Sequence, residues 1–468
     1  MINKQKGLIL DSLFFQIIRY QWILRYIATG YLIKQYPLKN TLFSIGFTLV
    51  IGCHVTADNS VNPQPETAII APPIVFQPLA KDDSLRYYNA VKSFFEKSLV
   101  GNRNFNGGIL VAKGESIIYE EYKGYKDMQT KQPLDASSPM HIASASKNFA
   151  AAAVLKLIQD GRIKMDDSLT AFFPNFPYSG VTVKMLMNHR SGLPNYVHYL
   201  EKMGWNKNQY ATNQDVLNSL YTMHPRPEFK AGTRFSYSNT NFVLLALLVE
   251  KLTGMPYADY LKKNFFEPLQ MNDTYVFSLA DSITAIKSYK PYGGVWEWDF
   301  LENTYGDKNI YTTPRDLLKW SLAWTQGKVV DSALLEAAFT PYSFERPGVH
   351  NYGLGWRLLM LKNGKKVIYH NGRWHGTNAA FAKLPDENIT IIIIGNRYNS
   401  NIYNTARKAY DIFGDYLQGG PTIDEDGELT YHEPPPVVHH HHKRSVAKKS
   451  SHRKYSSSSS KAVVKNKK

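Results

Sequence analysis

The stretch that decides the fold is SASKNFAAAAVLKLI, residues 144–158. After Asn148 it is almost continuously apolar, and a helix with so little polar surface lies in the core of a protein. The pattern therefore predicts a buried helix that begins near Ser144 and ends before Gly161. Lys147 follows Ser144 by three residues, which places both side chains on one face of that helix, one turn apart. We expect the lysine amine beside the serine hydroxyl.

A serine and a lysine in this arrangement can act as a nucleophile and its base. A serine hydroxyl is a poor nucleophile until a neighbouring base accepts its proton, and a lysine in apolar surroundings can act as that base. A capping serine beside a structural lysine explains the same residues without chemistry. The spacing also recurs at Ser445, Ser451 and Ser458, where no buried helix follows, so the motif alone is weak evidence.

Regular structure is predicted on both sides of this helix. Residues 106–122 indicate two strands around a Lys-Gly turn, and residues 388–395, rich in β-branched side chains, indicate a central strand. Residues 242–252 predict a second buried helix, and residues 403–417 predict an amphipathic closing helix. Strands at both ends with helices between them predict an α/β (α+β) domain, in which one sheet is built from both termini and a helical lobe is inserted.

Two further groups of polar residues lie next to predicted elements. Tyr237 and Asn239 belong to a turn-rich loop, residues 232–239, that leads directly into the second buried helix. His370 and Gly372 follow an apolar run, which places them on or beside a sheet edge. A lone tyrosine or histidine in such a place is more often structural, so it is the whole set that points to a site.

Ser-x-x-Lys, then Tyr-x-Asn, then His-x-Gly after an inserted helical region resembles the serine β-lactamase and penicillin-binding protein superfamily, specifically its class C-like branch. Residues 181–194, VTVKMLMNHRSGLP, are similar to a conserved segment of that branch, and residues 352–356, YGLGW, are similar to one of its strands. The resemblance covers roughly residues 105–412. It implies a β-lactamase/transpeptidase-like fold with an antiparallel sheet flanked by helices and an inserted helical domain.

The resemblance also implies roles for individual residues. Ser144 would be the acylated nucleophile, Lys147 its proton partner, and Tyr237 a general base or proton relay. Asn239 would donate to the substrate. His370 stands where many relatives have a lysine, so it would contribute a titratable, only partly positive group. The oxyanion hole would combine the backbone N–H groups of Ser144 and of the residue after Gly372, which is Arg373.

Composition and charge exclude several classes of protein. The formal net charge is +16 over 468 residues, but residues 1–52 carry six basic and one acidic side chain, and residues 443–468 carry ten basic and none acidic. The part between is close to neutral, so we expect no nucleic-acid partner. A single cysteine cannot close an intrachain disulfide, and no Cys/His spacing indicates a metal site. We expect neither a metal nor an organic cofactor.

The single cysteine, Cys53, ends the uncharged apolar run at residues 41–52, which follows Lys34 and Lys39. That order of basic, apolar and small residues is typical of a secretory signal and is too short for a membrane span. The ending Val-Ile-Gly-Cys resembles a bacterial lipobox, in which the cysteine becomes the lipidated first residue; a buried free thiol is the alternative. We expect a lipid-anchored protein of the cell envelope that faces the periplasm.

These features divide the chain into four predicted segments. They are a leader at residues 1–52, a proline-rich linker at 53–83, a hydrolase domain at 84–419 and a basic tail at 420–468. The tail, rich in His, Ser and Lys, is predicted to be disordered, and its charge would attract anionic envelope polymers. Its His439–His442 run could capture metal ions adventitiously.

The predicted function is that of a serine hydrolase that forms an acyl-enzyme at Ser144. A peptide, an ester or a β-lactam could be the substrate, a D-alanyl cell-wall peptide among them, because these differ by pocket shape rather than by motif. The alternative from another class is a catalytically inactive, cell-wall-binding lipoprotein that keeps the fold. The presence of Ser144, Lys147 and Tyr237 together counts against that alternative.

Overall fold

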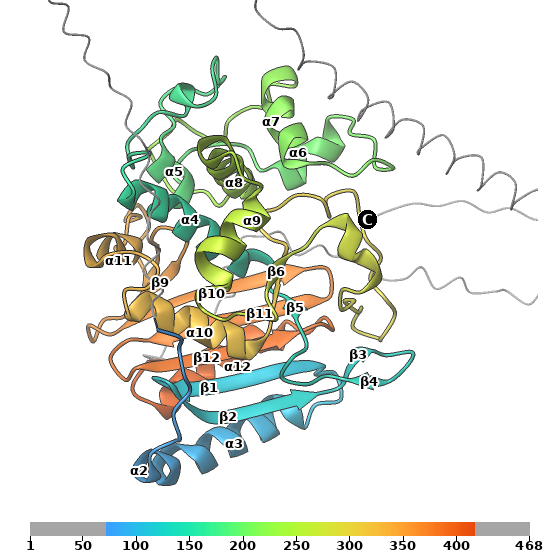
Figure 1. Cartoon of the computed structure of the whole chain (residues 1–468), viewed down its shortest axis with the longest axis vertical. Helices are drawn as coiled ribbons and strands as arrows, with labels where there is room; N and C mark the ends of the chain where they lie inside the picture. The colour runs from blue at the N-terminus through green and yellow to red at the C-terminus, as the bar shows by residue number, and fades with distance from the viewer. Residues whose placement is uncertain (1–71, 417–468) are drawn as a thin grey trace, which may run out of the picture. The chain divides into compact units, whose positions relative to one another are not determined.

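A seven-stranded antiparallel sheet forms the centre of residues 72–416, the part of the chain that the computed structural model describes. The strand order is β2-β1-β12-β11-β10-β9-β8, so strands from the two ends of this region meet at the β1–β12 pair. Figure 1 shows the blue strands lying beside the orange ones. The strands are β1 Gly107–Lys113, β2 Ser116–Lys123, β8 His350–Tyr352, β9 Arg357–Met360, β10 Lys366–Trp374, β11 Thr377–Leu384 and β12 Ile389–Gly395.

Several predictions concern residues outside this range. Cys53, the leader at 1–52, part of the linker at 53–83 and the tail at 420–468 lie outside the described residues, so the anchor and the domain limits stay predictions. Among residues 72–416, none of the helices combines the length and apolarity needed to cross a membrane.

Helices from the two ends of the described region cover one face of the sheet. The alternation of side chains along β12 explains why both faces need a cover: Ile391 and Ile393 point to one face, and Ile392 and Ile394 to the other. All four are fully buried, and each such burial contributes about 1.5–3 kcal/mol. The first face is covered by α2 Lys81–Asp83, η1 Ser84–Tyr88, α3 Asn89–Phe95, η2 Glu96–Val100, α12 Asn401–Ala409 and η7 Tyr410–Ile412.

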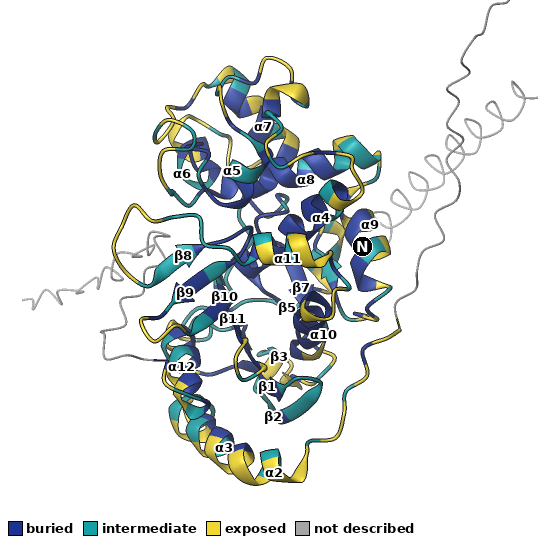
Figure 2. Ribbon diagram, turned by 90° about the vertical axis from the view of Figure 1, so that its left-hand side faces the viewer, coloured by how far each residue is buried: buried dark blue, intermediate teal, exposed yellow. Residues whose placement is uncertain are grey.

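The other face packs against α10 Pro314–Thr325 and α4 Lys147–Gln159, and beyond them lies the helical lobe. Figure 2 shows buried residues concentrated in the sheet and in α4 and α8, and exposed residues on the outer sides of α2 and α3. The lobe and its surroundings contain α5 Val183–Met187, α6 Tyr196–Lys202, α7 Asn213–Thr222, α8 Asn239–Thr253, α9 Tyr257–Leu261, η4 Leu169–Ala171, η5 Lys262–Phe266, η6 Leu279–Ile283 and α11 Ser332–Ala338.

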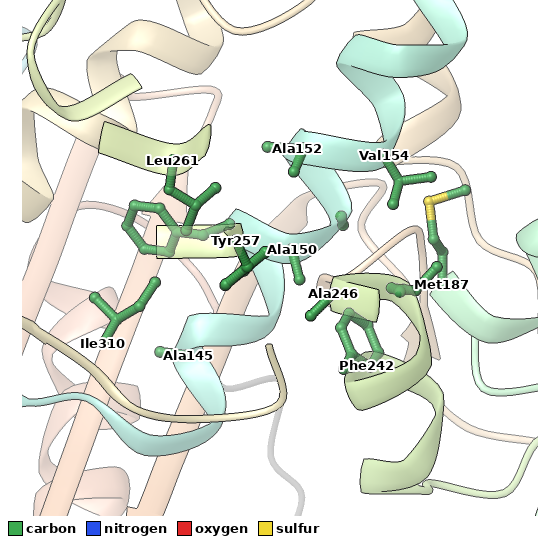
Figure 3. Packing of buried hydrophobic residues seen from close by; sticks show 14 of the residues in the cluster. Ala145, Ala150, Ala152, Val154, Met187, Phe242, Ala246, Tyr257, Leu261 and Ile310 are labelled. Carbon is green, nitrogen blue, oxygen red and sulfur yellow. The ribbon is translucent and has the colours of Figure 1, made fainter. Parts of the chain in front are cut away.

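Helices α4 and α8 pack directly against each other. Figure 3 shows the side chains between them, with Ala150 on α4 facing Ala246 and Phe242 on α8. Small side chains allow the two backbones to approach closely. Helix α8 ends at Gly254, which has φ +69°, a left-handed conformation that glycine adopts without strain.

Short strands complete the fold beside the main sheet. One small sheet has the order β5-β7-β6, and the other pairs β3 with β4. Their bounds are β3 Tyr125–Asp127, β4 Gln132–Pro133, β5 Met140–His141, β6 Tyr275–Val276 and β7 Ile310–Thr312.

The predicted fold class is confirmed: an antiparallel sheet with strands from both ends, flanked by helices, with a helical lobe inserted. The local boundaries differ in two places. The helix predicted from Ser144 begins as a 3₁₀ turn, η3 Ala143–Ser146, and becomes α-helical at Lys147. The closing helix predicted over residues 403–417 instead spans Asn401–Ala409 and ends in the turn η7.

Candidate active site

Ser144 lies at the junction between strand β5 and helix α4, within the turn η3. The preceding residue, Ala143, has φ +48°, the left-handed region that costs a non-glycine residue energy and that is found often at functional sites. Lys147 is the first residue of α4 and is fully buried, and its Nζ donates to Oγ of Ser144 at 3.1 Å. The structure therefore brings the two predicted catalytic side chains into direct contact.

Two other segments hold the Lys147 amine in place. Its Nζ donates to Oδ1 of Asn239 at 2.7 Å and to the backbone carbonyl of Asp307 at 2.8 Å. Asn239 opens α8, and its backbone N–H donates to Oδ1 of Asn195 at 3.2 Å. Because the Asn239 oxygen accepts from Lys147, the amide nitrogen is the atom of this side chain that would donate to a substrate. That role stays a prediction.

Tyr237 lies against the same lysine. The Lys147 Nζ is 4.9 Å from the centroid of the Tyr237 ring, and His189 also packs against this tyrosine, with ring centroids 4.3 Å apart. Nδ1 of His189 accepts from the backbone N–H of Ser238 at 3.2 Å and lies 3.0 Å from Nδ2 of Asn241. These contacts fix the orientation of the loop that carries Tyr237.

His370 lies on β10 just where the pairing of that strand with β9 ends, at Tyr369. From His370 onward this edge of β10 is not paired with β9 and packs against η3 instead. The imidazole is fully buried, its Nδ1 is 2.7 Å from the carbonyl oxygen of Asn371, and its Nε2 is 3.1 Å from the hydroxyl of Tyr352. A carbonyl can only accept, so Nδ1 carries the proton and Nε2 accepts from Tyr352.

The charge of His370 differs from the expectation. Burial, together with the positive charges of Arg357 and Lys147, lowers its pKa well below the usual value. The imidazole is therefore neutral near pH 7, and not the partly positive group that the resemblance implied. His189 has its pKa lowered in the same direction, first by burial and then by Lys147.

Gly372 brings strand β10 against the backbone of η3. A Cβ on this residue would lie 2.1 Å from the carbonyl oxygen of Ile142 and 3.1 Å from the backbone nitrogen of Ser144, so only glycine fits. Arg373 follows it on β10, and the guanidinium of Arg373 lies 5.3 Å from the ring centroid of Tyr398. Its side chain is thus engaged elsewhere, and the proposed oxyanion contribution is from its backbone N–H.

A buried ion pair next to Lys147 was not predicted from the sequence. Asp307, whose carbonyl accepts from Lys147, has its carboxylate 3.8 Å from Nζ of Lys308, and both side chains are 3% exposed or less. Tyr196 joins them: its hydroxyl donates to Oδ2 of Asp307 at 2.8 Å and accepts from Lys308 at 2.8 Å. Adjacent charged residues in a loop give no local signal of burial, so the pattern could not have revealed the pair.

Arg357 was also missed. It follows the YGLGW segment directly, and its guanidinium lies 5.2 Å from the ring centroid of Tyr237. Arg357 and Lys147 therefore both lie close to the Tyr237 ring. An adjacent fixed cation stabilises negative charge on a substrate or on a developing oxyanion.

The fold and the Ser–Lys–Tyr centre together define a protein of the serine β-lactamase and penicillin-binding protein class. A family model described as Beta-lactamase matches residues 95–413, more than half of the chain, and the protein belongs to this family. Proteins of this family are of the serine acyl-transferase and hydrolase type, and they act on small-molecule or peptide substrates.

Individual relatives agree with this assignment. Penicillin-binding protein 4* of Bacillus subtilis (strain 168) is 31% identical over 333 residues, which are 68% of this chain and 73% of that protein. The crystal structure of a penicillin-binding protein from Bacillus halodurans has a TM-score of 0.59 at 22% identity, covering 68% of this chain and 98% of the other. D-amino acid amidase from Ochrobactrum anthropi SV3, complexed with L-phenylalanine amide, has a TM-score of 0.58 at 25% identity, covering 69% and 96%.

Proposed function

We propose that this protein is a serine hydrolase that forms an acyl-enzyme at Ser144 and cleaves an amide or peptide bond next to a D-amino acid. The observation that carries the proposal is the 3.1 Å contact between Nζ of Lys147 and Oγ of Ser144 in a buried centre. Asn239 and Asp307 also accept from this amine, and these contacts hold it beside the serine.

The proposed reaction has two acyl-transfer steps. The Ser144 oxygen attacks the scissile carbonyl while its proton passes to the coupled pair Lys147 and Tyr237, and the backbone N–H groups of Ser144 and Arg373 stabilise the oxyanion. The pair then returns the proton to the leaving amine as the carbon–nitrogen bond breaks. A water molecule then attacks the ester of the acyl-enzyme in the same way, which releases the acid and regenerates the Ser144 hydroxyl. Lysine and tyrosine share the proton as one unit, so neither alone is assigned as the base.

The charge of the site supports a substrate with a negative group. The guanidinium of Arg357 lies 5.2 Å from the centroid of the Tyr237 ring, whereas His370, with its pKa lowered by burial, offers no positive charge. A peptide carboxylate or the carboxylate of a β-lactam would complement it. The D configuration is proposed because the related chains include one named a penicillin-binding protein and one named a D-amino acid amidase.

Covalent labelling tests the proposal. The protein is treated with a fluorophosphonate and, in parallel, with a penicillin, and adducts are mapped by peptide mass spectrometry. We expect one adduct on the peptide that contains Ser144 and none in Ser144→Ala. Hydrolysis of D-phenylalanine amide and of a D-alanyl-D-alanine peptide, each against its L isomer, then distinguishes the substrate classes.

The outcomes separate the alternatives. Labelling together with a preference for the L isomers would leave the acyl-enzyme in place and reject the D-amino-acid substrate. The absence of any adduct at Ser144, with the protein folded by circular dichroism, would reject the enzyme and favour the inactive cell-wall-binding protein.

We further propose that Cys53 is lipidated and that the protein is anchored in the cell envelope, facing the periplasm. The support is in the sequence: an apolar run that follows two lysines and ends in Val-Ile-Gly-Cys. Cys53→Ser should release the protein from membranes or block signal removal. A mature protein from native cells that begins upstream of Cys53 and carries no lipid by mass spectrometry would contradict this. Stable anchoring requires at least two acyl chains.

A further inference from the structure

Three potential metal ligands meet at the end of strand β10. Side-chain ligand atoms of Asp299, Glu302 and His375 all lie within 4.8 Å of one another. Nε2 of His375 is 2.5 Å from Oε1 of Glu302 and 3.8 Å from Oδ2 of Asp299. His375 forms the turn between β10 and β11, and the two acids come from a loop more than 70 residues earlier in the chain. Two oxygen donors and one imidazole nitrogen thus face a common point.

Each ligand is fixed by a contact of its own. Nε1–H of Trp374 donates to both carboxylate oxygens of Glu302, at 3.1 and 3.2 Å, and Glu302 is only 1% exposed. The backbone N–H of Leu301 donates to Oδ1 of Asp299 at 2.7 Å, which leaves Oδ2 directed at His375. His375 has φ +50°, a left-handed conformation that turns its ring toward the two acids. Ligands of metal ions are commonly oriented by such outer hydrogen bonds.

The charges of the cluster call for a cation. Lys308 pairs with Asp307 and is not within ion-pair distance of the cluster, and of the two acids Glu302 is fully buried whereas the Asp299 side chain is 38% exposed. Two carboxylates beside an imidazole match the preferences of first-row divalent transition ions, whereas calcium and magnesium prefer oxygen ligands alone.

We propose that Asp299, Glu302 and His375 bind one first-row divalent transition-metal ion, which clips the loop carrying the acids to the turn between β10 and β11. The proposal does not depend on the acyl-enzyme at Ser144, because the ion takes no part in that reaction. Strand β10 also carries His370 and Gly372, so the clip would hold the strand that forms one wall of the active site.

Binding of Zn²⁺ alone tests the proposal, but the tail offers a competing site. His439–His442 must therefore be replaced by glutamine in every protein used. In that background, equilibrium dialysis with elemental analysis should give close to one Zn²⁺ per chain. Co²⁺ should give visible d–d absorption bands that Zn²⁺ abolishes. Losing one ligand should weaken binding by at least about tenfold, since even loss of an outer-shell partner costs 10- to 100-fold.

Three variants and one control make the test specific. His375→Gln and Glu302→Gln remove a ligand each, and Asp299→Asn does so at a partly exposed position where misfolding is not a concern. Glu297→Gln is the matched control, since Glu297 is an exposed acid in the same loop but outside the cluster. We expect the first three to lose Zn²⁺ affinity and the control to keep it.

Two results would overturn the proposal. One is a stoichiometry near zero in the protein without the four tail histidines, which would mean that Glu302 and His375 form only an ion pair. The other is Zn²⁺ binding that Asp299→Asn and His375→Gln leave unchanged. The titration is repeated with Ser144→Ala, whose Zn²⁺ affinity should equal that of the protein with Ser144. The test of the metal site is therefore independent of whether an acyl-enzyme forms.

Discussion

Replacing Lys308 by methionine should destabilise the protein strongly, although Lys308 is not expected to touch substrate. Methionine keeps most of the length of the side chain and removes its charge. The Asp307 carboxylate then stays buried without the charge of Lys308. It keeps the hydrogen bond from the Tyr196 hydroxyl, at 2.8 Å. A substitution that leaves a buried charge without its counter-ion is one of the few single changes that lower the stability of a protein by several kcal/mol.

The structure sets the size of the effect. At the observed 3.8 Å separation, the attraction between the two charges is about 4 kcal/mol for an effective dielectric constant of about 20. Breaking one partner of a buried pair costs about 3–5 kcal/mol in measured cases. We therefore expect Lys308→Met to lower the free energy of unfolding by about 3–5 kcal/mol. The double variant Asp307→Asn with Lys308→Met should recover most of this, since it leaves no charge uncompensated.

Urea unfolding, followed by circular dichroism and by tryptophan fluorescence, measures these differences. Coincident transitions by the two probes would justify a two-state treatment. Lys207→Met is the control, because its pair with Glu201 is more than half exposed on both sides and should contribute about 0–1 kcal/mol. A cost of less than about 1 kcal/mol for Lys308→Met, or a double variant no more stable than the single one, would contradict the stabilising role of this ion pair.

The other predictions concern the reaction and the pH dependence of stability. Tyr237→Phe keeps the ring but removes the hydroxyl, so kcat should fall about 10²- to 10⁴-fold, and an unchanged kcat would exclude the tyrosine from the relay. Gly372→Ala should abolish acylation, because its Cβ would lie 2.1 Å from the carbonyl of Ile142; normal labelling of this variant would contradict the proposed contact. Burial lowers the pKa of His141 from 6.5 to about 4 and that of His370 in the same direction. Stability should therefore be lost as pH falls from about 6.5 toward 4, by about 1.4 kcal/mol per pH unit for each neutral histidine, in urea titrations across pH. A flat profile over that window would refute the assignment.

Local patterns predicted the elements whose sequence is nearly all apolar or strictly alternating. The burial of α4 and α8 follows from runs such as residues 149–158 and 242–249, and the β1–β2 hairpin follows from its turn. The 3₁₀ turn at Ser144 could not be predicted, because the position of Ala143 in the left-handed region depends on strand β10 packing against it. Propensity alone says nothing about such a tertiary constraint.

The candidate site could also be predicted only in part from the sequence. Ser144 and Lys147 are three residues apart, so helix geometry alone placed them together, and the resemblance added Tyr237 and Asn239. The other contacts of Lys147 come from 92 and 160 residues further along the chain, and only the folded structure brings them to the amine. Asp307 binds the Lys147 amine through its backbone carbonyl. Every residue has such a carbonyl, so no sequence motif marks this position.

The hydrogen bonds of His370 bear on which group receives the proton of Ser144. A histidine that acts as a general base needs a ring nitrogen directed at the nucleophile and a pKa near the working pH. In His370 one nitrogen donates to the Asn371 carbonyl and the other accepts from Tyr352, while burial and two nearby cations lower the pKa well below its usual value. Nζ of Lys147, in contrast, lies 3.1 Å from Oγ of Ser144. Geometry and charge therefore favour the lysine with its neighbouring tyrosine over a serine–histidine arrangement, and a contact of the neutral His370 with substrate stays a prediction.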